Sequence, residues 1–116
     1  MLTISNNNII TVTRGDSFSL SFCDFIVNTI DPDCTLHPGD SAYFGLMEPN
    51  HQFEHALIRK KVTNETEEDM PRVEFTFTPE MTEFLLPGNY YYSVKIERAN
   101  GDVETLINKT KFRILD

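Results

Sequence analysis

The residues with the most obvious chemical potential are His51, Glu54 and His55, which follow the pattern H-x-x-E-H. On a helix, two histidines four positions apart share one face and can bind zinc, while the glutamate acts as the general base of a hydrolase. In a strand, His51 and Glu54 would point to opposite faces, and no such site would form. Because residues 51–62 have only a poor helical apolar stripe, we expect loop histidines before a strand at about 55–62. A zinc-dependent hydrolase is therefore the least favoured function.

A second motif with chemical meaning is Arg14-Gly15-Asp16-Ser17, which matches the tetrapeptide that integrins recognise. Such recognition needs an exposed loop on an exported protein, and residues 1–6 lack the basic and apolar regions of a signal peptide. The same residues suit a tight turn between two strands, because glycine accepts a positive φ and aspartate hydrogen-bonds to nearby backbone. We therefore predict a turn here.

Other catalytic patterns are missing from the sequence. It has no glycine-rich phosphate loop, no G-x-S-x-G turn and no C-x-x-C pair. Cys23 and Cys34 cannot complete a four-ligand zinc site; they could pair in an exported protein, but we expect them to be reduced thiols. The acidic run at 65–69 is expected to be a solvated loop in which like charges repel. The sequence therefore predicts no enzyme, no catalytic residue, no metal and no cofactor.

Charge and composition narrow the possible partners. The 116 residues carry a formal net charge of −8. This negative charge disfavours binding to nucleic acid, whose phosphates select basic surfaces, and binding to anionic membranes. It has no run of 18 apolar residues, so we expect no membrane-spanning segment. With 40% hydrophobic and 11% aromatic residues, it can build one core, and a basic or neutral protein partner fits its charge.

Alternation of apolar and polar residues predicts most of the elements that must position these groups. Strands are expected at residues 9–13, 17–22, 42–47, 73–77 and 111–115. One or two helical turns are expected near 79–85, with Thr78 as the cap and Pro79 at the first position. Gly45 indicates either a bulge or a close approach to the strand backbone.

The clearest strand follows the Pro87-Gly88 turn. Tyr91 falls on the outward face of this strand, where it could anchor a partner. Four side chains share the inward face: Tyr90, Tyr92, Val94 and Ile96. Asn100-Gly101 then indicates a two-residue type I′ turn, which needs a positive φ at both central residues. The return strand is expected at 103–108. This register places Val94 opposite Ile107 and Ile96 opposite Thr105.

Seven to eight short strands with frequent turn signals are typical of an antiparallel β-sandwich. We expect a flexible asparagine-rich N-terminal arm at residues 1–8. Residues 9–116 are expected to form a single sandwich domain.

Several motifs, taken in order, add a resemblance that covers nearly the whole chain. They are Thr13-Arg14-Gly15-Asp16-Ser17-Phe18, Pro38-Gly39-Asp40, Tyr43-Phe44-Gly45-Leu46, Glu48-Pro49-Asn50, Phe75-Thr76-Phe77-Thr78-Pro79-Glu80 and Leu86-Pro87-Gly88-Asn89-Tyr90-Tyr91-Tyr92. In this order they resemble small prophage-encoded proteins of Gram-positive bacteria. Those proteins are similar to the immunoglobulin-like (Ig-like) N-terminal domain of phage baseplate upper proteins. The resemblance implies an Ig-like sandwich of seven to eight strands, used in virion assembly without catalysis, with Arg-Gly-Asp as a strand-entry turn.

The sequence departs from the baseplate proteins by ending at Asp116, without a receptor-binding or linker portion. This leaves a small accessory, decoration, neck or tail protein open beside a baseplate role. We therefore expect a non-enzymatic virion structural protein, made in the host cytoplasm, that docks to other virion proteins, with a homo-oligomer as one form. The expected contact residues are Asn6, Asn7, Asn8, Arg14, Asp16 and Tyr91. The alternative is a β-sandwich that binds carbohydrate or the host surface through Tyr91.

Overall fold

The computed structural model describes residues 2–5, 7–22, 35–50, 52–70 and 73–116. Among them are eight β-strands, one short α-helix and one 3-10 turn, so the protein is mostly β, as predicted. The bounds are β1 Leu2–Ile4, β2 Ile10–Thr13, β3 Phe18–Phe22, β4 Ser41–Met47, η1 Phe53–His55, β5 Ile58–Thr63, β6 Val73–Phe77, α1 Pro79–Glu83, β7 Gly88–Glu97 and β8 Val103–Leu115.

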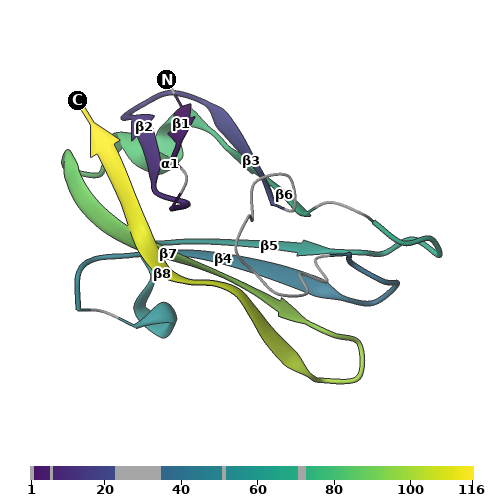
Figure 1. Cartoon of the computed structure of the whole chain (residues 1–116). Coiled ribbons are helices and arrows are strands. Elements are labelled where there is room, and N and C mark those ends of the chain that lie inside the picture. The colour runs from purple at the N-terminus through teal and green to yellow at the C-terminus, as the bar shows by residue number, and fades with distance from the viewer. Residues whose placement is uncertain (1, 6, 23–34, 51, 71–72) are drawn as a thin grey trace.

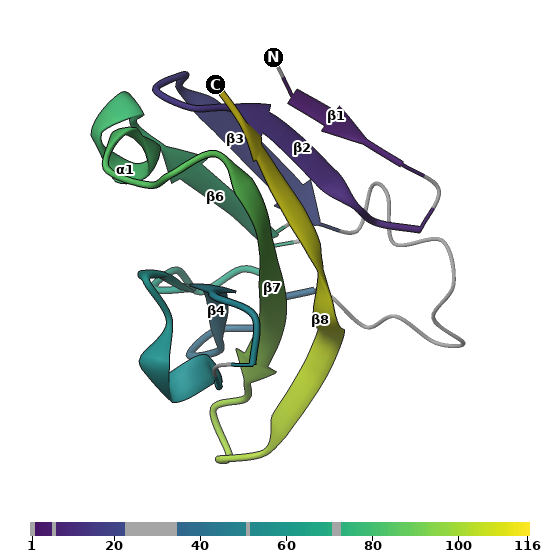
Figure 2. The same ribbon diagram turned by 90° about the vertical axis from the view of Figure 1, so that its left-hand side faces the viewer.

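The strands form two sheets. A six-stranded sheet has the order β1-β2-β8-β7-β4-β5, and β3 pairs with β6 in a two-stranded sheet. The larger sheet curls into a half-barrel, and the smaller sheet lies over its inner side (Figures 1 and 2). Both chain ends and α1 lie together at one end of the molecule, while the β7–β8 turn and the tip of β5 extend toward the other (Figure 1).

One pairing differs from the expected antiparallel arrangement. β2 runs parallel to β8, with Ile10 beside Phe112 and Val12 beside Ile114. No hairpin joins these two strands, because β2 leads through the turn at Gly15 into β3 of the other sheet. A tight loop therefore does not force an antiparallel direction on β2, and the six-stranded sheet is mixed.

The β7–β8 hairpin keeps one predicted cross-strand pair and changes the other. Val94 lies opposite Ile107, as predicted, whereas Ile96 lies opposite Glu104 and not Thr105. The connecting turn is longer than the two-residue loop, and within it only the glycine has a positive φ. A type I′ turn is therefore excluded. A register shift between Val94 and Lys95 then brings Val94 back opposite Ile107, the predicted partner.

β8 joins two segments that were expected as separate strands, 103–108 and 111–115, into one strand of 13 residues. Lys109 interrupts its regular backbone with a φ of +26°. The Lys109 N–H donates to the Ser93 hydroxyl at 3.0 Å, so a side chain of β7 satisfies this group. Ser93 is buried, although it alternates with the core residues of β7.

The ambiguous segment after residue 50 is a 3-10 turn followed by β5. The strand expected at about 55–62 is correct in type, but it begins three residues later, at Ile58. The helical turn expected near 79–85 is confirmed as α1, with Pro79 in its first turn. Thr78 precedes it, but its side chain makes no capping hydrogen bond.

The core lies between the two sheets and is rich in aromatic rings. Phe44 of β4 stacks on Tyr92 with ring centroids 5.7 Å apart, and it meets Phe77 of β6 edge-on at 5.1 Å. The side chains predicted to face inward from β7 are all buried: Tyr90, Tyr92, Val94 and Ile96. Full burial of a Phe side chain contributes roughly 1.5–3 kcal/mol, so these contacts make a large part of the stability.

Candidate functional site

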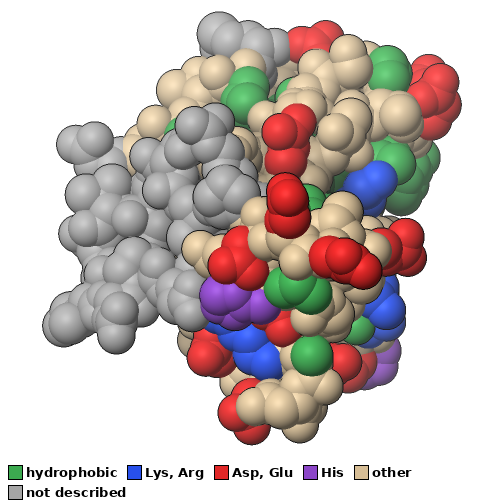
Figure 3. Space-filling view, turned by 90° about the vertical axis from the view of Figure 1, so that its right-hand side faces the viewer, with side chains coloured by type: hydrophobic (Ala, Val, Ile, Leu, Met, Phe, Trp, Pro, Cys, Tyr) green, Lys and Arg blue, Asp and Glu red, His purple; other side chains and the backbone are tan. Residues whose placement is uncertain are grey.

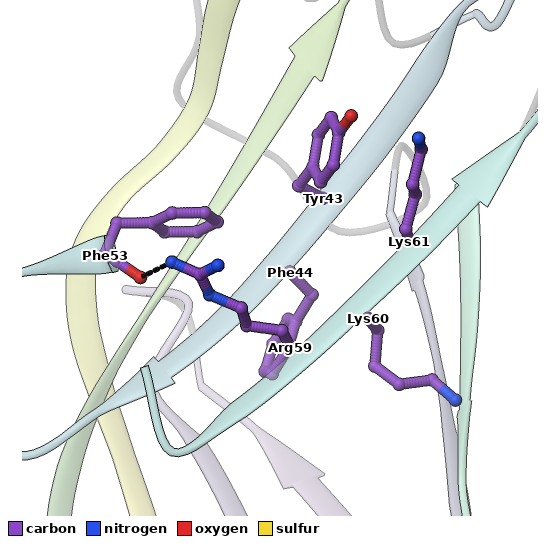
Figure 4. A pocket seen from close by; sticks show the side chains of 6 residues that line it. All are labelled: Tyr43, Phe44, Phe53, Arg59, Lys60 and Lys61. Atoms are coloured by element: carbon purple, nitrogen blue, oxygen red, sulfur yellow. Dashed lines mark hydrogen bonds between the residues drawn. The ribbon is translucent and has the colours of Figure 1, made fainter. Parts of the chain in front are cut away.

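A pocket of about 290 Å³ opens beside β4, β5 and η1. Figure 4 shows the side chains that line it: Tyr43, Phe44, Phe53, Arg59, Lys60 and Lys61. Strand alternation directs Phe44 and Lys60 toward the core side of the sheet. The outer walls therefore come from Tyr43, Phe53, Arg59 and Lys61.

Gly45 makes room for the ring of Phe53. A Cβ on Gly45 would lie 2.6 Å from Cε2 of Phe53, so the ring rests directly against the strand. The close approach predicted at this glycine is confirmed, and β4 pairs with both neighbours without a bulge. Arg59 helps to fix this turn, because its Nη2 donates to the Phe53 carbonyl at 3.1 Å.

Three cationic groups gather over two aromatic rings. Lys95 Nζ lies 4.6 Å from the centroid of Phe53, and the guanidinium carbon of Arg59 lies 5.8 Å from the same ring. Lys61 Nζ lies 5.4 Å from the centroid of Tyr43. The sheet explains this grouping, since Tyr43 pairs with Lys61 on β5 and with Lys95 on β7. We call Tyr43, Phe53, Arg59, Lys61 and Lys95 the cationic pocket.

The cationic pocket has the chemistry of an anion site. In the described part of the chain, no carboxylate lies within ion-pair distance of Arg59, Lys61 or Lys95. Like charges held close together repel one another, and an incoming anion would relieve that repulsion. Arginine and lysine together offer donors that suit a carboxylate.

The sequence predicted the close approach at Gly45, but it did not predict the cationic pocket that lies beside this glycine. Alternation alone places Arg59 and Lys61 on one face of β5. The grouping with Lys95 depends on β4 lying between β5 and β7, and a sequence without an alignment does not determine strand order.

Two of the three H-x-x-E-H residues are described. Glu54 and His55 are both exposed and lie in η1, while His51 lies outside the described residues. Across the described ranges, no group of three or more His, Cys, Asp or Glu side chains is placed to hold a metal ion. Cys23 and Cys34 also lie outside the described residues.

Arg14-Gly15-Asp16 forms a turn, as predicted. Gly15 has a φ of +81°, and its N–H donates to the Thr82 hydroxyl of α1 at 3.0 Å. The Arg14 guanidinium donates to the Asp116 carboxylate at 2.9 Å. The turn is thus fastened to α1 and to the residue after β8.

The described part of the asparagine-rich segment packs against the fold. Asn7 is exposed and Asn8 is half-buried, whereas Asn6 lies outside the described residues. Asn8 has a φ of +63°, and its carbonyl accepts a hydrogen bond from the Tyr92 hydroxyl. Within the expected arm, β1 pairs antiparallel with β2. The proposed partner contacts of these asparagines stay predictions.

Tyr91 lies on the outward face of β7, as its position predicted, and is half-buried. It borders a hollow of about 190 Å³ together with Glu48, Pro49, Asn50 and Lys109. Its role as a partner anchor stays a prediction.

Large apolar side chains are exposed at the end that holds both chain termini. Phe84 and Leu86, between α1 and β7, are 63% and 75% exposed, and Leu115 of β8 is 39% exposed. Gly88 pairs with Ile114, which brings the α1–β7 connection beside the end of β8. We call Phe84, Leu86 and Leu115 the apolar end.

A buried ion pair lies near the β7–β8 turn. Arg98 Nη1 lies 2.9 Å from Asp40 Oδ2, and both side chains are largely buried. The backbone N–H groups of His37 and Ala99 also donate to the Asp40 carboxylate, at 2.9 and 2.8 Å. Burial would raise the pKa of Asp40, but the hydrogen bonds from Arg98, Ala99 and His37 outweigh it and hold that pKa below its usual value.

The surface at this end of the molecule is acidic. Figure 3 shows Asp and Glu side chains spread over it, with basic side chains in smaller groups. In the loop after β5, the exposed acids are Glu65, Glu67, Glu68 and Asp69. These acids follow β5 directly, whereas Arg59 and Lys61 of the cationic pocket lie on β5 itself.

Comparison with models of known protein families finds no match for this chain, and a search of the curated proteins finds none either. Among the described residues, no helix has the length and apolar character needed to cross a membrane.

Proposed function

We propose that this protein is a non-enzymatic structural component of a phage or prophage virion, an Ig-like module that docks to other virion proteins. The observation that carries the docking is the apolar end, where Phe84, Leu86 and Leu115 expose apolar surface beside both chain termini. Contiguous exposed apolar groups are typical of protein–protein interfaces. The ordered sequence motifs supply the virion assignment.

The strand order supports the Ig-like part of the proposal. In variable-type immunoglobulin domains, strands G, F, C and C′ are neighbours in one sheet, and B and E lie in the other. Here β8, β7, β4 and β5 are neighbours in that order, and β3 pairs with β6. The chain order agrees, because β3 to β8 would be strands B, C, C′, E, F and G.

Tyr90 supports the same assignment. Ig-like domains carry a tyrosine near the start of strand F whose hydroxyl bonds to the backbone a few residues upstream. Tyr90 lies near the start of β7, and its hydroxyl donates to the Leu86 carbonyl at 2.7 Å. Two residues later, Tyr92 packs against Phe44 of β4, where antibody domains place a cysteine against a tryptophan.

Purified particles from an induced lysogen test both parts of the proposal. Mass spectrometry is expected to find the protein in intact particles. The double variant Phe84→Ser/Leu86→Ser is expected to be incorporated about tenfold less, because interface anchors of this kind contribute at least about 1.4 kcal/mol. Val103→Ser is the matched control, since Val103 is 60% exposed in the β8 strand at the other end of the molecule.

Absence of the protein from intact particles would overturn the virion assignment. Normal incorporation of the Phe84/Leu86 variant would overturn the apolar end as the docking surface. Thermal unfolding of each variant shows that reduced incorporation does not come from loss of the fold.

The hollow beside Tyr91 favours carbohydrate binding as a second function. It combines one aromatic ring with the polar side chains of Glu48 and Asn50, a mixture that suits a sugar. An array of bacterial surface glycans is the direct measurement. Binding that Tyr91→Ala abolishes would support this function, and an array without any bound glycan would eliminate it.

A further inference from the structure

We propose that the cationic pocket of one copy binds the acidic loop of a second copy, residues 64–69, so that the protein self-associates. Both surfaces lie on this chain, and their charges are complementary. They are distinct from the apolar end, so the proposal does not depend on the virion assignment.

The cationic pocket holds its charges close together without neutralising them. Two rings hold Lys95, Arg59 and Lys61 at cation–π distances of 4.6–5.8 Å. None of the three has a carboxylate partner among the described residues. The chain is acidic as a whole, so a group of three unneutralised cations is unusual on its surface. An acidic occupant completes this site.

The acidic loop is held in a fixed shape by Asn64, whose side chain is buried. The Asn64 Nδ2 donates to the carbonyls of Leu36 and Glu68, at 2.8 Å each. Its Oδ1 accepts from the N–H and the hydroxyl of Thr66, at 2.9 and 2.7 Å. All four hydrogen-bonding positions of the amide are used. Because the loop is already ordered, binding it costs less conformational entropy than binding a flexible tail.

Three carboxylates of this loop are available to a partner. Glu65, Glu67 and Glu68 are exposed and form no ion pair within the described ranges. Asp69 is engaged locally, since its Oδ1 lies 2.9 Å from Nδ1 of His37. The loop therefore presents three glutamates against the three cations of the cationic pocket.

The positions of the two surfaces favour a second copy as the occupant. Arg59 and Lys61 project from the face of β5, and the loop begins where β5 ends. Within one copy no described acid reaches the pocket. Each copy carries both halves of the contact, so two copies can bind each other reciprocally in a closed dimer, or successive copies can form a ring or an open chain.

Sedimentation equilibrium in about 0.1 M salt measures the association. At that ionic strength the Debye length is about 10 Å, so repulsion between the acidic copies is screened while contact pairs persist. Wild-type protein is expected to form complexes as its concentration rises. The pocket variant Arg59→Glu/Lys61→Glu and the loop variant Glu67→Lys/Glu68→Lys are each expected to weaken association at least about tenfold.

Mixing the two variants gives the sharpest test. The pocket variant has an acidic pocket, which can bind the basic loop of the loop variant. The loop variant keeps its basic pocket, which can bind the native acidic loop of the pocket variant. The mixture is expected to regain the wild-type association. Lys111→Glu/Arg113→Glu changes the net charge as the pocket variant does, but alters β8 instead, and it is expected to associate like the wild type.

A wild-type protein that stays monomeric over the whole concentration range would overturn the proposal. So would a mixture of folded variants that fails to associate, or a Lys111/Arg113 control that dissociates as the pocket variant does. Particle purification gives an independent answer on the virion role, so failure of one proposal is distinguishable from failure of the other.

Discussion

The hydroxyl of Tyr92 donates a hydrogen bond to the backbone carbonyl of Asn8, a residue 84 positions earlier in the chain. Tyr92 is fully buried, so this bond fastens the end of the β1–β2 turn to the aromatic core. Asn8 adopts a positive φ, a conformation that asparagine tolerates better than most residues. One asparagine of the N-terminal segment thus has a structural role.

Tyr92→Phe is expected to lower the free energy of unfolding by about 1 kcal/mol, because it removes one hydrogen bond and leaves the ring packed. Urea unfolding measures this loss. Amide hydrogen exchange is expected to accelerate in β1 and β2 more than in β4. Tyr91→Phe is the control, and equal exchange in both variants would contradict the fastening role of Tyr92.

Alkaline pH is expected to destabilise the protein through Tyr92. Burial raises the pKa of the Tyr92 hydroxyl well above the unfolded value of 10.0. The neutral phenol is therefore favoured by folding, and its contribution is complete below pH 10 and lost as the pH rises toward the folded pKa. The loss is about 1.4 kcal/mol per pH unit. Unfolding curves between pH 8 and 11 are expected to show a steeper decline for the wild type than for Tyr92→Phe.

The buried carboxylate of Asp40 is expected to control acid stability. Its pKa is lowered from 3.8 on folding, so its contribution is present above pH 3.8 and lost as the pH falls through the lower folded pKa. Asp40→Asn is expected to cost about 3 kcal/mol at neutral pH, because Arg98 loses a buried partner. Unfolding measured from pH 7 to pH 2 is expected to show this difference shrinking below pH 3.8. The control Glu97→Gln changes an exposed acid, and an equal loss there would refute the assignment.

The Asn64 amide is expected to be a main support of the loops around it. Asn64→Ala removes its four hydrogen bonds and leaves the buried carbonyl of Leu36 without this donor. The expected loss is about 2–4 kcal/mol in the free energy of unfolding. Asn89→Ala, at an exposed position, is the comparison. A loss below about 1 kcal/mol at Asn64 would show that the loop does not need this residue.

Gly45→Ala is expected to displace the Phe53 ring while keeping the fold. The added Cβ would lie too close to the far end of a flexible side chain, which can rotate away into solvent. Lys95, whose ammonium lies over that ring, would lose its aromatic partner. NMR is expected to show the Lys95 side-chain protons losing an upfield ring-current shift, and Phe53→Leu is expected to give the same change. Unaltered Lys95 shifts in both variants would exclude the contact in solution.

Individual strands could be predicted from the sequence because their side chains alternate between core and solvent. Tyr90 and Tyr92 illustrate this, since both are buried as predicted. The parallel partner of β2 could not be predicted, because its pairing depends on residues about a hundred positions away. The β7–β8 turn also differed, since Asn100-Gly101 favours a type I′ turn locally while the surrounding ladder accepts a longer one.

The cationic pocket could not be predicted from the sequence either, because distant segments of the chain form it. Arg59 and Lys61 give a visible pattern, but Phe53 and Lys95 join them only through η1 and the strand order. The structural role of Asn64 was still harder to predict from the sequence. The polar segment 64–70 is expected to be an exposed loop, which is correct for residues 65–69 and wrong for Asn64. Alternation and charge do not reveal one buried amide that bonds to Thr66 two residues later.

The parallel pairing of β2 with β8 has a consequence for how the protein folds. β7 and β8 can form their hairpin from neighbouring residues, whereas β2 gains its partner only when the last strand is available. During synthesis the first strands therefore leave the ribosome long before their sheet can be completed. Long-range closure of this kind slows folding to roughly milliseconds to seconds. We expect the hairpin to gain protection from hydrogen exchange first during refolding, and β2 to gain it last.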